Sequence, residues 1–407
     1  MKRSVSQMAN YSDRIQSLTP QQQELLRLRV EQRKEHKPAA PMPPSSGKAL
    51  GKVDFSLFFF SADGTVVGQD RYKLLLEAAR FADQHGFQAI WTPERHFQVF
   101  GGLYPNPAVL SAALAMITEH VQIRAGSVVL PLHSPVRVAE DWSQVDILSR
   151  GREGISFATG WHEHDYVIAP DAYESRREIM FRDIAIVRRL WAGEAIELPG
   201  PRGTNITVKT LPRPIQPELP FWVTVSSPKT WVRAGAIGSH VLTAFVGGEW
   251  DDLRQSIAAY RRARLENGYN PDTGIVSLML HTYVGTDMEE IRARVREPMK
   301  RYLQNFLDQF RPLAKHDPID ANSHEMQSLL DFAFERYFES RSLLGTQTKC
   351  LEILSVLASL GVNEAACLVD FGLDYESTMK GLEHLSEMRR FLASNAVAGI
   401  EGSSDGC

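Results

Sequence analysis

Short apolar runs alternate with amphipathic segments along most of the chain. Within residues 125–161, an apolar run at 126–130 precedes a segment at 136–148 whose apolar residues recur at helical spacing, and a second apolar run follows at 154–158. Strand, helix and strand within about 30 residues form a parallel β–α–β unit. Gly126 lies at one end of the first run and Gly160 follows the second, and ligands usually bind in the loops at one end of a parallel sheet.

The same alternation predicts eight strands separated by helices. The expected strands are residues 53–62, 87–97, 121–130, 154–158, 221–226, 239–245, 276–285 and 363–372. The expected helices are residues 70–85, 107–117, 136–148, 173–191, 251–267 and 377–392. Continuously apolar strands are typical of a parallel sheet that is covered on both faces. Periodicity alone leaves open whether the sheet closes into a barrel.

Two segments depart from the alternation. Residues 204–211 contain the alternating pattern ITVKTL, which predicts an extra hairpin. Residues 284–361 are too long for one helix and include a second, aromatic helical pattern, LLDFAFERYF. We expect this second segment to be an insertion after the seventh strand, acting either as a lid over the mouth of the fold or as a dimer surface.

The first 50 residues differ in composition from the rest. Thr19 and Pro20 are typical of a helix start, and the proline-rich segment KPAAPMPPSSGK that follows predicts an extended linker. The segment resembles helical linkers that precede domains in peptide-synthetase assembly lines, which implies docking. A frayed tail, or a helix packed on the main domain, is the alternative. We expect the main domain at residues 51–395 and a disordered tail at 396–407.

The composition excludes several classes of protein. The chain has 407 residues, a net charge of −4 and 23% charged residues, without a basic stripe for nucleic acid. It has no apolar run of the roughly 18 residues that a membrane span needs. Its polar N-terminus lacks the apolar core of a secretion signal, which favours the cytoplasm. The three cysteines have no metal-binding or disulfide-rich spacing, so we expect reduced thiols.

Four motifs, in order, carry a resemblance to a known family. They are TPERHF (92–97), YPNP (104–107), PLHSPVRVAEDWSQVDILSRGR (131–152) and ATGWH (158–162). Together they resemble the bacterial luciferase-like flavin monooxygenases over residues 53–392. The resemblance implies a (β/α)8 TIM barrel. Within the family, the chain looks most like the branch found in polyketide and nonribosomal peptide assembly lines.

The resemblance implies where a flavin cofactor, FMN, would bind. Ser226 and Ser227 lie where the fifth strand turns into a helix that begins at Pro228, and the matching turn in the family holds the flavin phosphate. Hydroxyls and helix N-terminal amides suit a phosphate dianion. An N-cap role alone would explain one of the two serines. Gly126 and Ser127 match the place where the family commonly has a cis peptide beneath the flavin ring.

Further cofactor contacts are implied at two other positions. Tyr173 and Arg176 match the start of a helix whose tyrosine or arginine reaches the phosphate, although a shift of one residue would place Arg177 there instead. Luciferases proper have an arginine at the end of the fourth strand, where this chain has Thr159 followed by Gly160. Hydroxyl or backbone donors must replace that arginine.

TPERHF supplies the candidate catalytic residues Glu94, Arg95 and His96, at the strand end where barrel enzymes place their catalysts. Luciferases proper have two histidines after the glutamate, and this chain replaces the first with Arg95. His96 can exchange a proton near neutral pH, although a packed structural histidine is the alternative. Arg95 suits an anionic substrate group better than it suits base catalysis.

The segment HEHDY holds His162 and Asp165, which we expect to line the substrate pocket. It has no distant fourth ligand, so the sequence does not favour a metal site. No phosphate-binding GxxxxGK[ST] pattern is present, and no GxGxxG follows a strand, so neither an ATP site nor a Rossmann NAD site is indicated.

The resemblance implies a two-component monooxygenase. Such a protein receives reduced FMN from an external flavin reductase and inserts one atom of O2 into an organic substrate. The assembly-line branch implies a carrier-protein-bound substrate, and we also expect a homodimer. Two alternatives remain at this point: an enzyme of the same fold that transfers hydride with the deazaflavin F420, and a non-catalytic flavin-binding or docking component.

Overall fold

The computed structural model describes residues 53–61, 70–244, 249–308 and 323–401. Contacts divide the chain into units Met1–Lys48 and Ala49–Cys407, and all described residues belong to the second unit. The helix and linker expected within residues 1–50 therefore lie outside the described residues. Residues 396–401, expected in a disordered tail, continue the last helix, and 402–407 lie outside the described part.

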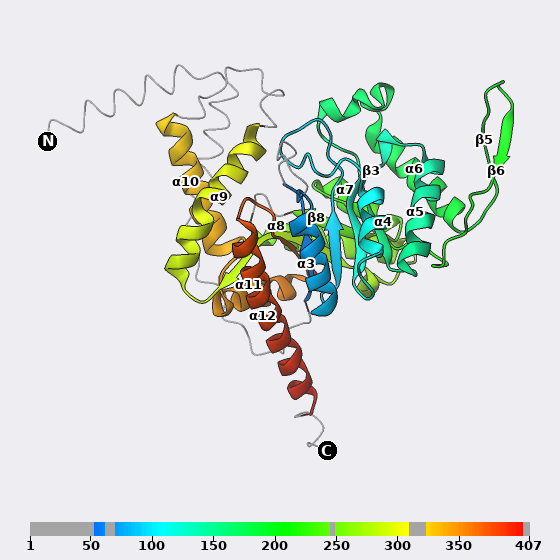
Figure 1. Cartoon of the computed structure of the whole chain (residues 1–407). Helices are drawn as coiled ribbons and strands as arrows, with labels where there is room; N and C mark the ends of the chain where they lie inside the picture. Colours follow the sequence, from blue (N-terminus) through cyan, green and yellow to red (C-terminus); the bar gives the residue numbers. More distant parts are fainter. Residues whose placement is uncertain (1–52, 62–69, 245–248, 309–322, 402–407) are drawn as a thin grey trace. The chain divides into compact units, whose positions relative to one another are not determined.

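Eight parallel strands of the described residues close into a barrel (Figure 1). They are β1 Asp54–Phe58, β2 Ala89–Thr92, β3 Gln122–Val129, β4 Glu153–Ala158, β7 Phe221–Thr224, β8 His240–Ala244, β9 Val276–Gly285 and β11 Glu364–Leu368. Neighbours pair in that order, and β11 pairs with β1 to close the ring. The expected TIM barrel is confirmed, and each strand overlaps its predicted run.

Helices connect consecutive strands, as a parallel barrel requires. They are α3 Lys73–Gln84, α4 Pro107–Ala115, α5 Pro135–Ser149, α6 Arg176–Trp191, α7 Pro228–Ala236, α8 Trp250–Glu266, α11 Gln347–Leu360 and α12 Tyr375–Glu401. Proline opens α4, α5 and α7, where its missing N–H costs nothing. In α4, the Asn106 side chain also accepts a hydrogen bond from the Val109 N–H at 3.1 Å.

A hairpin projects from the barrel between α6 and β7 (Figure 1). It consists of β5 Ile196–Pro199 and β6 Asn205–Val208, paired antiparallel. The expectation of a hairpin within 204–211 was therefore wrong in its bounds, because ITVKTL forms only the second strand. The first strand comes from the short stretch IELP, which has no clear alternation.

The insertion after β9 contains two helices that lie side by side, α9 Met288–Asp308 and α10 His324–Ser340 (Figure 1). Ion pairs join them: Arg296 bonds Asp331 and Glu335, each at 2.9 Å, and Lys300 also bonds Asp331 at 2.9 Å. The following strand, β10 Leu343–Thr346, adds in parallel to the end of β9. The insertion is shorter than the expected 284–361, because α11 is a helix of the barrel itself.

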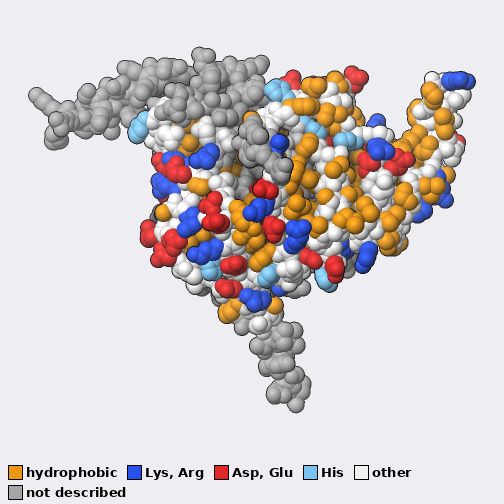
Figure 2. All heavy atoms as spheres, viewed as in Figure 1, with side chains coloured by type: hydrophobic (Ala, Val, Ile, Leu, Met, Phe, Trp, Pro, Cys, Tyr) orange, Lys and Arg blue, Asp and Glu red, His pale blue; other side chains and the backbone are white. Residues whose placement is uncertain are grey.

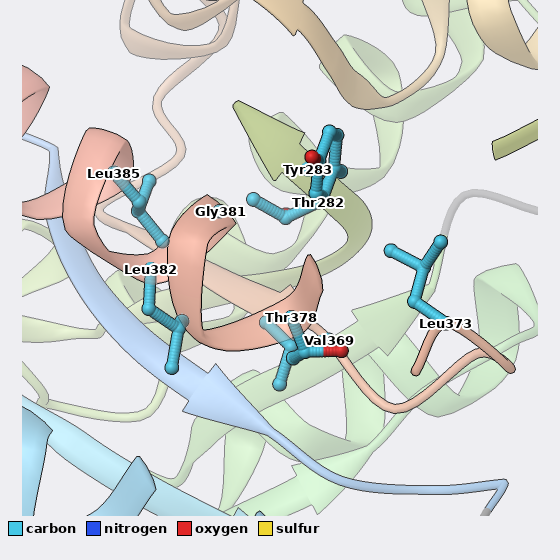
Figure 3. A pocket seen from close by; sticks show the side chains of 8 residues that line it. All are labelled: Thr282, Tyr283, Val369, Leu373, Thr378, Gly381, Leu382 and Leu385. Carbon is cyan, nitrogen blue, oxygen red and sulfur yellow. The ribbon is translucent and has the colours of Figure 1, made fainter. Parts of the chain in front are cut away.

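The interior of the barrel contains a buried polar cluster near the start of its strands. Glu364 accepts hydrogen bonds from Ser277 Oγ, Trp91 Nε1 and Ser56 Oγ, and it pairs with the Arg124 guanidinium at 2.7 Å. These bonds satisfy the charges of this cluster. A separate gap of about 10 Å³ between β9 and α12 is no larger than a water molecule needs, so we interpret it as a packing defect (Figure 3).

Candidate active site

A cavity of about 750 Å³ opens at the C-terminal ends of the strands, the face where barrel enzymes carry their sites. Its lining includes most of the candidate residues, namely Glu94, Arg95, Gly126, Ser127, Thr159, Gly160, His162, Asp165 and Ser226. His96, Tyr173, Arg176 and Ser227 lie outside that lining. The fold therefore brings together nine candidate residues from four separate stretches of the chain.

Hydroxyl groups line the cavity between β3 and β7. Ser127 Oγ hydrogen-bonds Thr224 Oγ1, which lies 2.8 Å from Ser156 Oγ on the strand between them. The peptide bond between Gly126 and Ser127 is cis, and the pairing of β3 with β4 shifts register at this point. A row of polar groups thus follows one wall of an otherwise largely apolar cavity.

The turn from β7 into α7 presents the two candidate serines differently. Ser226 is exposed and lines the cavity together with Pro228, the first residue of α7. Ser227 is the N-cap residue of α7, and its hydroxyl lies 2.9 Å from Thr230 Oγ1 instead of capping the helix backbone. An anion at this edge of the cavity would meet the N-terminus of α7 and a nearby hydroxyl.

The end of β4 is held by aromatic contacts. Tyr166 donates a hydrogen bond to the Thr159 carbonyl, and its ring packs at 5.1 Å from the ring of Tyr173. Arg176 donates to the Tyr173 carbonyl at 2.5 Å, and its guanidinium lies 4.2 Å from the centre of that ring. The two candidate phosphate ligands on this side, Tyr173 and Arg176, therefore contact each other, and Tyr173 packs against the tyrosine that bonds the end of β4.

Glu94 lies at the centre of a buried cluster with two histidines. Its Oε1 lies 2.9 Å from His96 Nε2 and 2.6 Å from His133 Nε2, while Oε2 accepts the Val129 N–H at 2.7 Å. Burial raises the pKa of Glu94, but the bonds from His133, His96 and Val129 outweigh it and hold the pKa below its ordinary value. Burial lowers the pKa of His133, and the Glu94 carboxylate more than compensates, so that pKa is raised.

The position of Arg95 follows from the aromatic rings around it. Its guanidinium lies 4.7 Å from the ring centre of Phe60, 5.3 Å from that of Phe100 and 5.9 Å from that of Trp161. Burial lowers the pKa of Arg95, while the nearby Tyr302 hydroxyl and Asp165 carboxylate act in the opposite direction. Because an arginine stays protonated in proteins, the cavity wall carries a permanent positive charge.

His162 and Asp165, which the sequence analysis expects in the substrate pocket, line the cavity beside Arg95. Burial, followed by the nearby His164 and Arg95, lowers the pKa of His162, and burial raises the pKa of Asp165. His162 is buried, and its Nδ1 has no hydrogen-bond partner among the described residues. Within that part of the chain, no group of histidine, cysteine, aspartate and glutamate side chains could hold a metal ion.

Sequence reasoning missed several residues of the site. His133 follows β3 within PLHSP, and only its bond to Glu94 reveals its place. His281, on β9, and Tyr302 and Tyr337, on α9 and α10, line the cavity from the opposite side. A histidine near the C-terminal end of a predicted barrel strand is a signal that would have selected His281.

Relatives with known names cover most of the chain. It is 26% identical to the oxygenase component of a flavin-dependent trigonelline monooxygenase from Acinetobacter baylyi, over 77% of this chain and 88% of the relative. It is 30% identical to limonene 1,2-monooxygenase from Rhodococcus erythropolis, over 65% of this chain and 68% of the relative. It is 24% identical to an alkanal monooxygenase alpha chain from Photorhabdus luminescens, over 58% and 64%.

Solved structures share the fold. The monooxygenase RslO1 from Streptomyces bottropensis has a TM-score of 0.70 at 22% identity and covers 83% of this chain and 98% of its own. The oxygenating component of 3,6-diketocamphane monooxygenase from Pseudomonas putida, in complex with FMN, has a TM-score of 0.67 at 18% identity with the same coverage. At these identities the likeness shows the fold alone.

A parallel eight-stranded barrel with a large cavity at the C-terminal ends of its strands defines a TIM-barrel enzyme. The luciferase-like monooxygenase family model matches residues 52–364, so the chain belongs to that family. The family resemblance drawn from the four motifs is thereby confirmed. No described helix is long and apolar enough to span a membrane.

Proposed function

We propose that the chain is the oxygenase component of a two-component flavin monooxygenase. It would bind reduced FMN made by a separate flavin reductase and use O2 to oxygenate an organic substrate. The observation that carries this proposal is the large cavity in a member of the luciferase-like family, with hydroxyls along one wall and a helix N-terminus at its edge. The name of the Acinetobacter relative, an oxygenase component, supports the separate reductase.

The residues around the cavity fit FMN. A volume of about 750 Å³ lies within the range of about 300–1,000 Å³ typical of cofactor sites. Ser226, Ser227 and the N-terminus of α7 would hold the phosphate, and Gly126 with Ser127 would support the ring. When bound, reduced FMN supplies the electrons that activate O2.

The remaining side chains would orient the substrate and handle the proton. Glu94 holds His96 and His133 through hydrogen bonds, so either imidazole could take up and return a proton at a fixed position. His96 does not line the cavity, so it would act on a group in the cavity through Glu94 or after a small movement. Arg95 contributes a fixed positive charge at the wall, and the rings of Trp161 and Phe306, which also line the cavity, would help to exclude water.

The substrate and partners belong to the same proposal. The assembly-line resemblance favours a substrate attached to a carrier protein, with residues 1–50 as the docking segment, and a cytoplasmic location. A homodimer is supported by α4, whose residues are all apolar except the buried Ser111, because Val109 in this helix and its C-cap residue Met116 are exposed. Hydrophobic side chains also cover much of the face over α4 and α5 in Figure 2. A helix that is apolar on all sides is normally buried.

One alternative cofactor has a structural neighbour. An F420-dependent secondary alcohol dehydrogenase shares the fold with a TM-score of 0.61 at 16% identity. The absorbance spectrum of the pigment bound to the purified chain distinguishes FMN from F420. A non-catalytic flavin-binding or docking component would bind FMN without consuming oxygen when reduced flavin is supplied.

The decisive test is mass spectrometry of candidate substrates, free and carrier-bound, after incubation with reduced FMN and 18-oxygen gas. We expect one product to gain the mass of a single labelled oxygen atom. A mass change of two hydrogens without label would instead identify a hydride-transfer enzyme. FMN binding with neither change, across substrates that saturate the site, would contradict a catalytic role.

A further inference from the structure

The cavity has two chemically different halves. The half between β3 and β7 is lined by the hydroxyls of Ser127, Thr224 and Ser226. The opposite half, which we name the aromatic half, is defined by Phe60, Trp161, His281, Tyr302, Phe306 and Tyr337. Because the hydroxyl half suits the flavin phosphate and ring, the aromatic half is the space left for a substrate.

Rings in the aromatic half form a connected wall. Tyr302 and Phe306, on α9, lie parallel with their ring centres 6.5 Å apart, and Trp161 lies 6.5 Å from Phe306. Tyr302 and Tyr337 meet the His281 ring nearly at right angles, at 4.3 and 5.8 Å. Aromatic rings prefer such tilted or offset neighbours at centre distances of about 4.5–7 Å. The wall is therefore shaped to receive another planar ring.

His281 is the polar group of this half that lacks a partner. Its side chain is buried at 5% exposure, and its Nε2 forms no hydrogen bond with any described residue. Burial lowers the pKa of His281 to about 3, so the imidazole is neutral near pH 7. A buried polar atom without a partner is costly and rare in native proteins. A ligand that supplies the partner would remove that cost.

The chemistry of the wall selects the ligand. A neutral imidazole nitrogen donates in one tautomer and accepts in the other, and a phenol hydroxyl can complement either. A carboxylate could only accept, and its burial among neutral rings would carry a desolvation cost. The Arg95 guanidinium, 4.7 Å from Phe60 and 5.9 Å from Trp161, repels cations and attracts the face of an electron-rich ring.

We propose that the aromatic half is a substrate subsite for an uncharged phenolic ring, with the ring against Tyr302 and Phe306 and its hydroxyl bonded to His281 Nε2 once a small rotation of the imidazole turns that enclosed atom toward the cavity. The proposal rests on the proposed function, since it takes the hydroxyl half as the flavin site and this half as the substrate site. It narrows the substrate class to molecules, free or carrier-bound, that present a phenol.

Fluorine NMR titrations of the full chain test the subsite with three matched probes. 4-Fluorophenol carries the hydroxyl, 4-fluorotoluene replaces it with a methyl group, and 4-fluorobenzoate replaces it with a carboxylate. We expect 4-fluorophenol to bind about tenfold more tightly than 4-fluorotoluene, the scale of one buried hydrogen bond. 4-Fluorobenzoate should bind more weakly than 4-fluorophenol.

Substitutions of His281 test whether this residue causes the preference for 4-fluorophenol over 4-fluorotoluene. His281→Phe keeps a planar ring but loses the nitrogen, so the preference for 4-fluorophenol should disappear while 4-fluorotoluene affinity stays within about threefold. His281→Gln keeps a donor and an acceptor and should retain part of the preference, which also covers the case in which the phenylalanine variant does not fold. His240→Gln is the control, because His240 is an imidazole outside the cavity that bonds the Ile275 N–H at 3.0 Å.

Three results would overturn the proposal. Equal affinity of the wild type for 4-fluorophenol and 4-fluorotoluene would show that no hydrogen bond to the hydroxyl forms. Tighter binding of 4-fluorobenzoate than of 4-fluorophenol would indicate an anion site at Arg95 instead. An unchanged preference in both His281 variants would place the phenol elsewhere. FMN titrations of the wild type, run in parallel, distinguish failure of the proposed function from failure of the subsite. Absence of FMN binding alone would contradict the proposed function. Absence of a preference for 4-fluorophenol alone would contradict the subsite.

Discussion

Replacing Glu94 with glutamine gives the sharpest test of the site's electrostatics. The Glu94 side chain is fully buried, and its two oxygens face Val129 N–H at 2.7 Å, His133 Nε2 at 2.6 Å and His96 Nε2 at 2.9 Å. Glutamine keeps the shape and one acceptor oxygen but loses the negative charge. The change therefore removes the charge assistance from this cluster with little effect on packing.

The expected loss of stability is about 2 kcal/mol. A hydrogen bond to a charged group contributes about 1.5–3 kcal/mol. The glutamine oxygen can still accept the Val129 N–H, and its amide can donate to imidazoles that change tautomer, so the three contributions do not add. His133 is about a third exposed, so solvent screens its interaction with Glu94 and reduces the stability that this bond contributes. In a domain of this size, about 2 kcal/mol lowers the melting temperature by roughly 2–4 °C.

The loss should depend on pH in a defined direction. The pKa of Glu94 is lowered in the folded state, so its contribution is present above its ordinary value of 4.5 and disappears as pH falls through the folded pKa. The pKa of His133 is raised, so its contribution is complete below its ordinary value of 6.5 and disappears as pH rises through the folded pKa. The gap between wild type and Glu94→Gln should thus be widest between about pH 4.5 and 6.5.

Calorimetry of both proteins at pH 5.5 and pH 8.5 measures this difference. We expect the melting temperatures to differ more at pH 5.5 than at pH 8.5. Glu178→Gln is the control, because Glu178 pairs with Arg233 at the surface and should show little change at either pH. An equal difference in melting temperature between wild type and Glu94→Gln at both pH values would refute the inference that charge stabilises this cluster.

Four further predictions concern the cofactor, the N-terminal segment, the proton and the barrel. Replacing Ser226 and Ser227 together by alanine should weaken FMN at least tenfold in a fluorescence titration, and unchanged affinity would exclude the α7 turn as the phosphate site. Removing residues 1–45 should preserve the melting temperature and FMN binding but lower turnover of a carrier-bound substrate; equal turnover would argue against docking. His96→Ala should lower the oxygenated product by roughly 10²-fold, with flavin affinity within about threefold and the consumed oxygen released as hydrogen peroxide, whereas full product yield would make His96 structural. Glu153 is buried without a partner among the described residues, and burial followed by Asp146 raises its pKa well above the ordinary value. The ionised carboxylate therefore destabilises the folded state more as pH rises. Glu153→Gln should raise the melting temperature by about 2 °C or more at pH 8 and by less at pH 5. A larger gain at pH 5 would contradict this reasoning.

Most of the barrel could be predicted from the sequence because its strands are buried on both faces. The run VSLMLHTYVG forms β9 over its whole length, and the run at 154–158 begins only one residue after β4 does. Closure of the sheet was not predictable from periodicity, because an open sheet has the same apolar strands. It depended on the family resemblance and is settled by the pairing of β11 with β1.

Short elements without a core face were harder to predict. Strand β5 has the sequence IELP, in which only Ile196 is buried, so no alternation identifies it. Strand β10, LLGT, is mostly buried but is four residues long and lies between two helices. Its pairing with the end of β9 is a tertiary contact that local sequence does not encode.

The candidate site was predicted where chemistry follows a strand directly. Glu94, Ser127 and Thr159 all come at strand ends, and the barrel brings such ends together. His133 lies beyond the end of β3, and only folding brings its imidazole to Glu94. His281 lies within an apolar strand, and only its place toward the C-terminal end of that strand distinguishes it from a core residue. The rings that pack against it, Tyr302 and Tyr337, come from α9 and α10 of the insertion, and local sequence does not show where these helices lie over the barrel.

Two buried polar groups of the barrel, Glu364 and His281, show why burial alone does not identify a ligand site. Glu364 accepts from Ser56, Trp91 and Ser277 and pairs with Arg124, so its oxygens are already used. His281 is nearly as buried, but its imidazole lines the cavity and its Nε2 has no partner among the described residues. A satisfied buried carboxylate stabilises one arrangement of strands. A ligand that bonded the unsatisfied imidazole would lower the free energy of the complex, so His281 and not Glu364 is the candidate ligand contact.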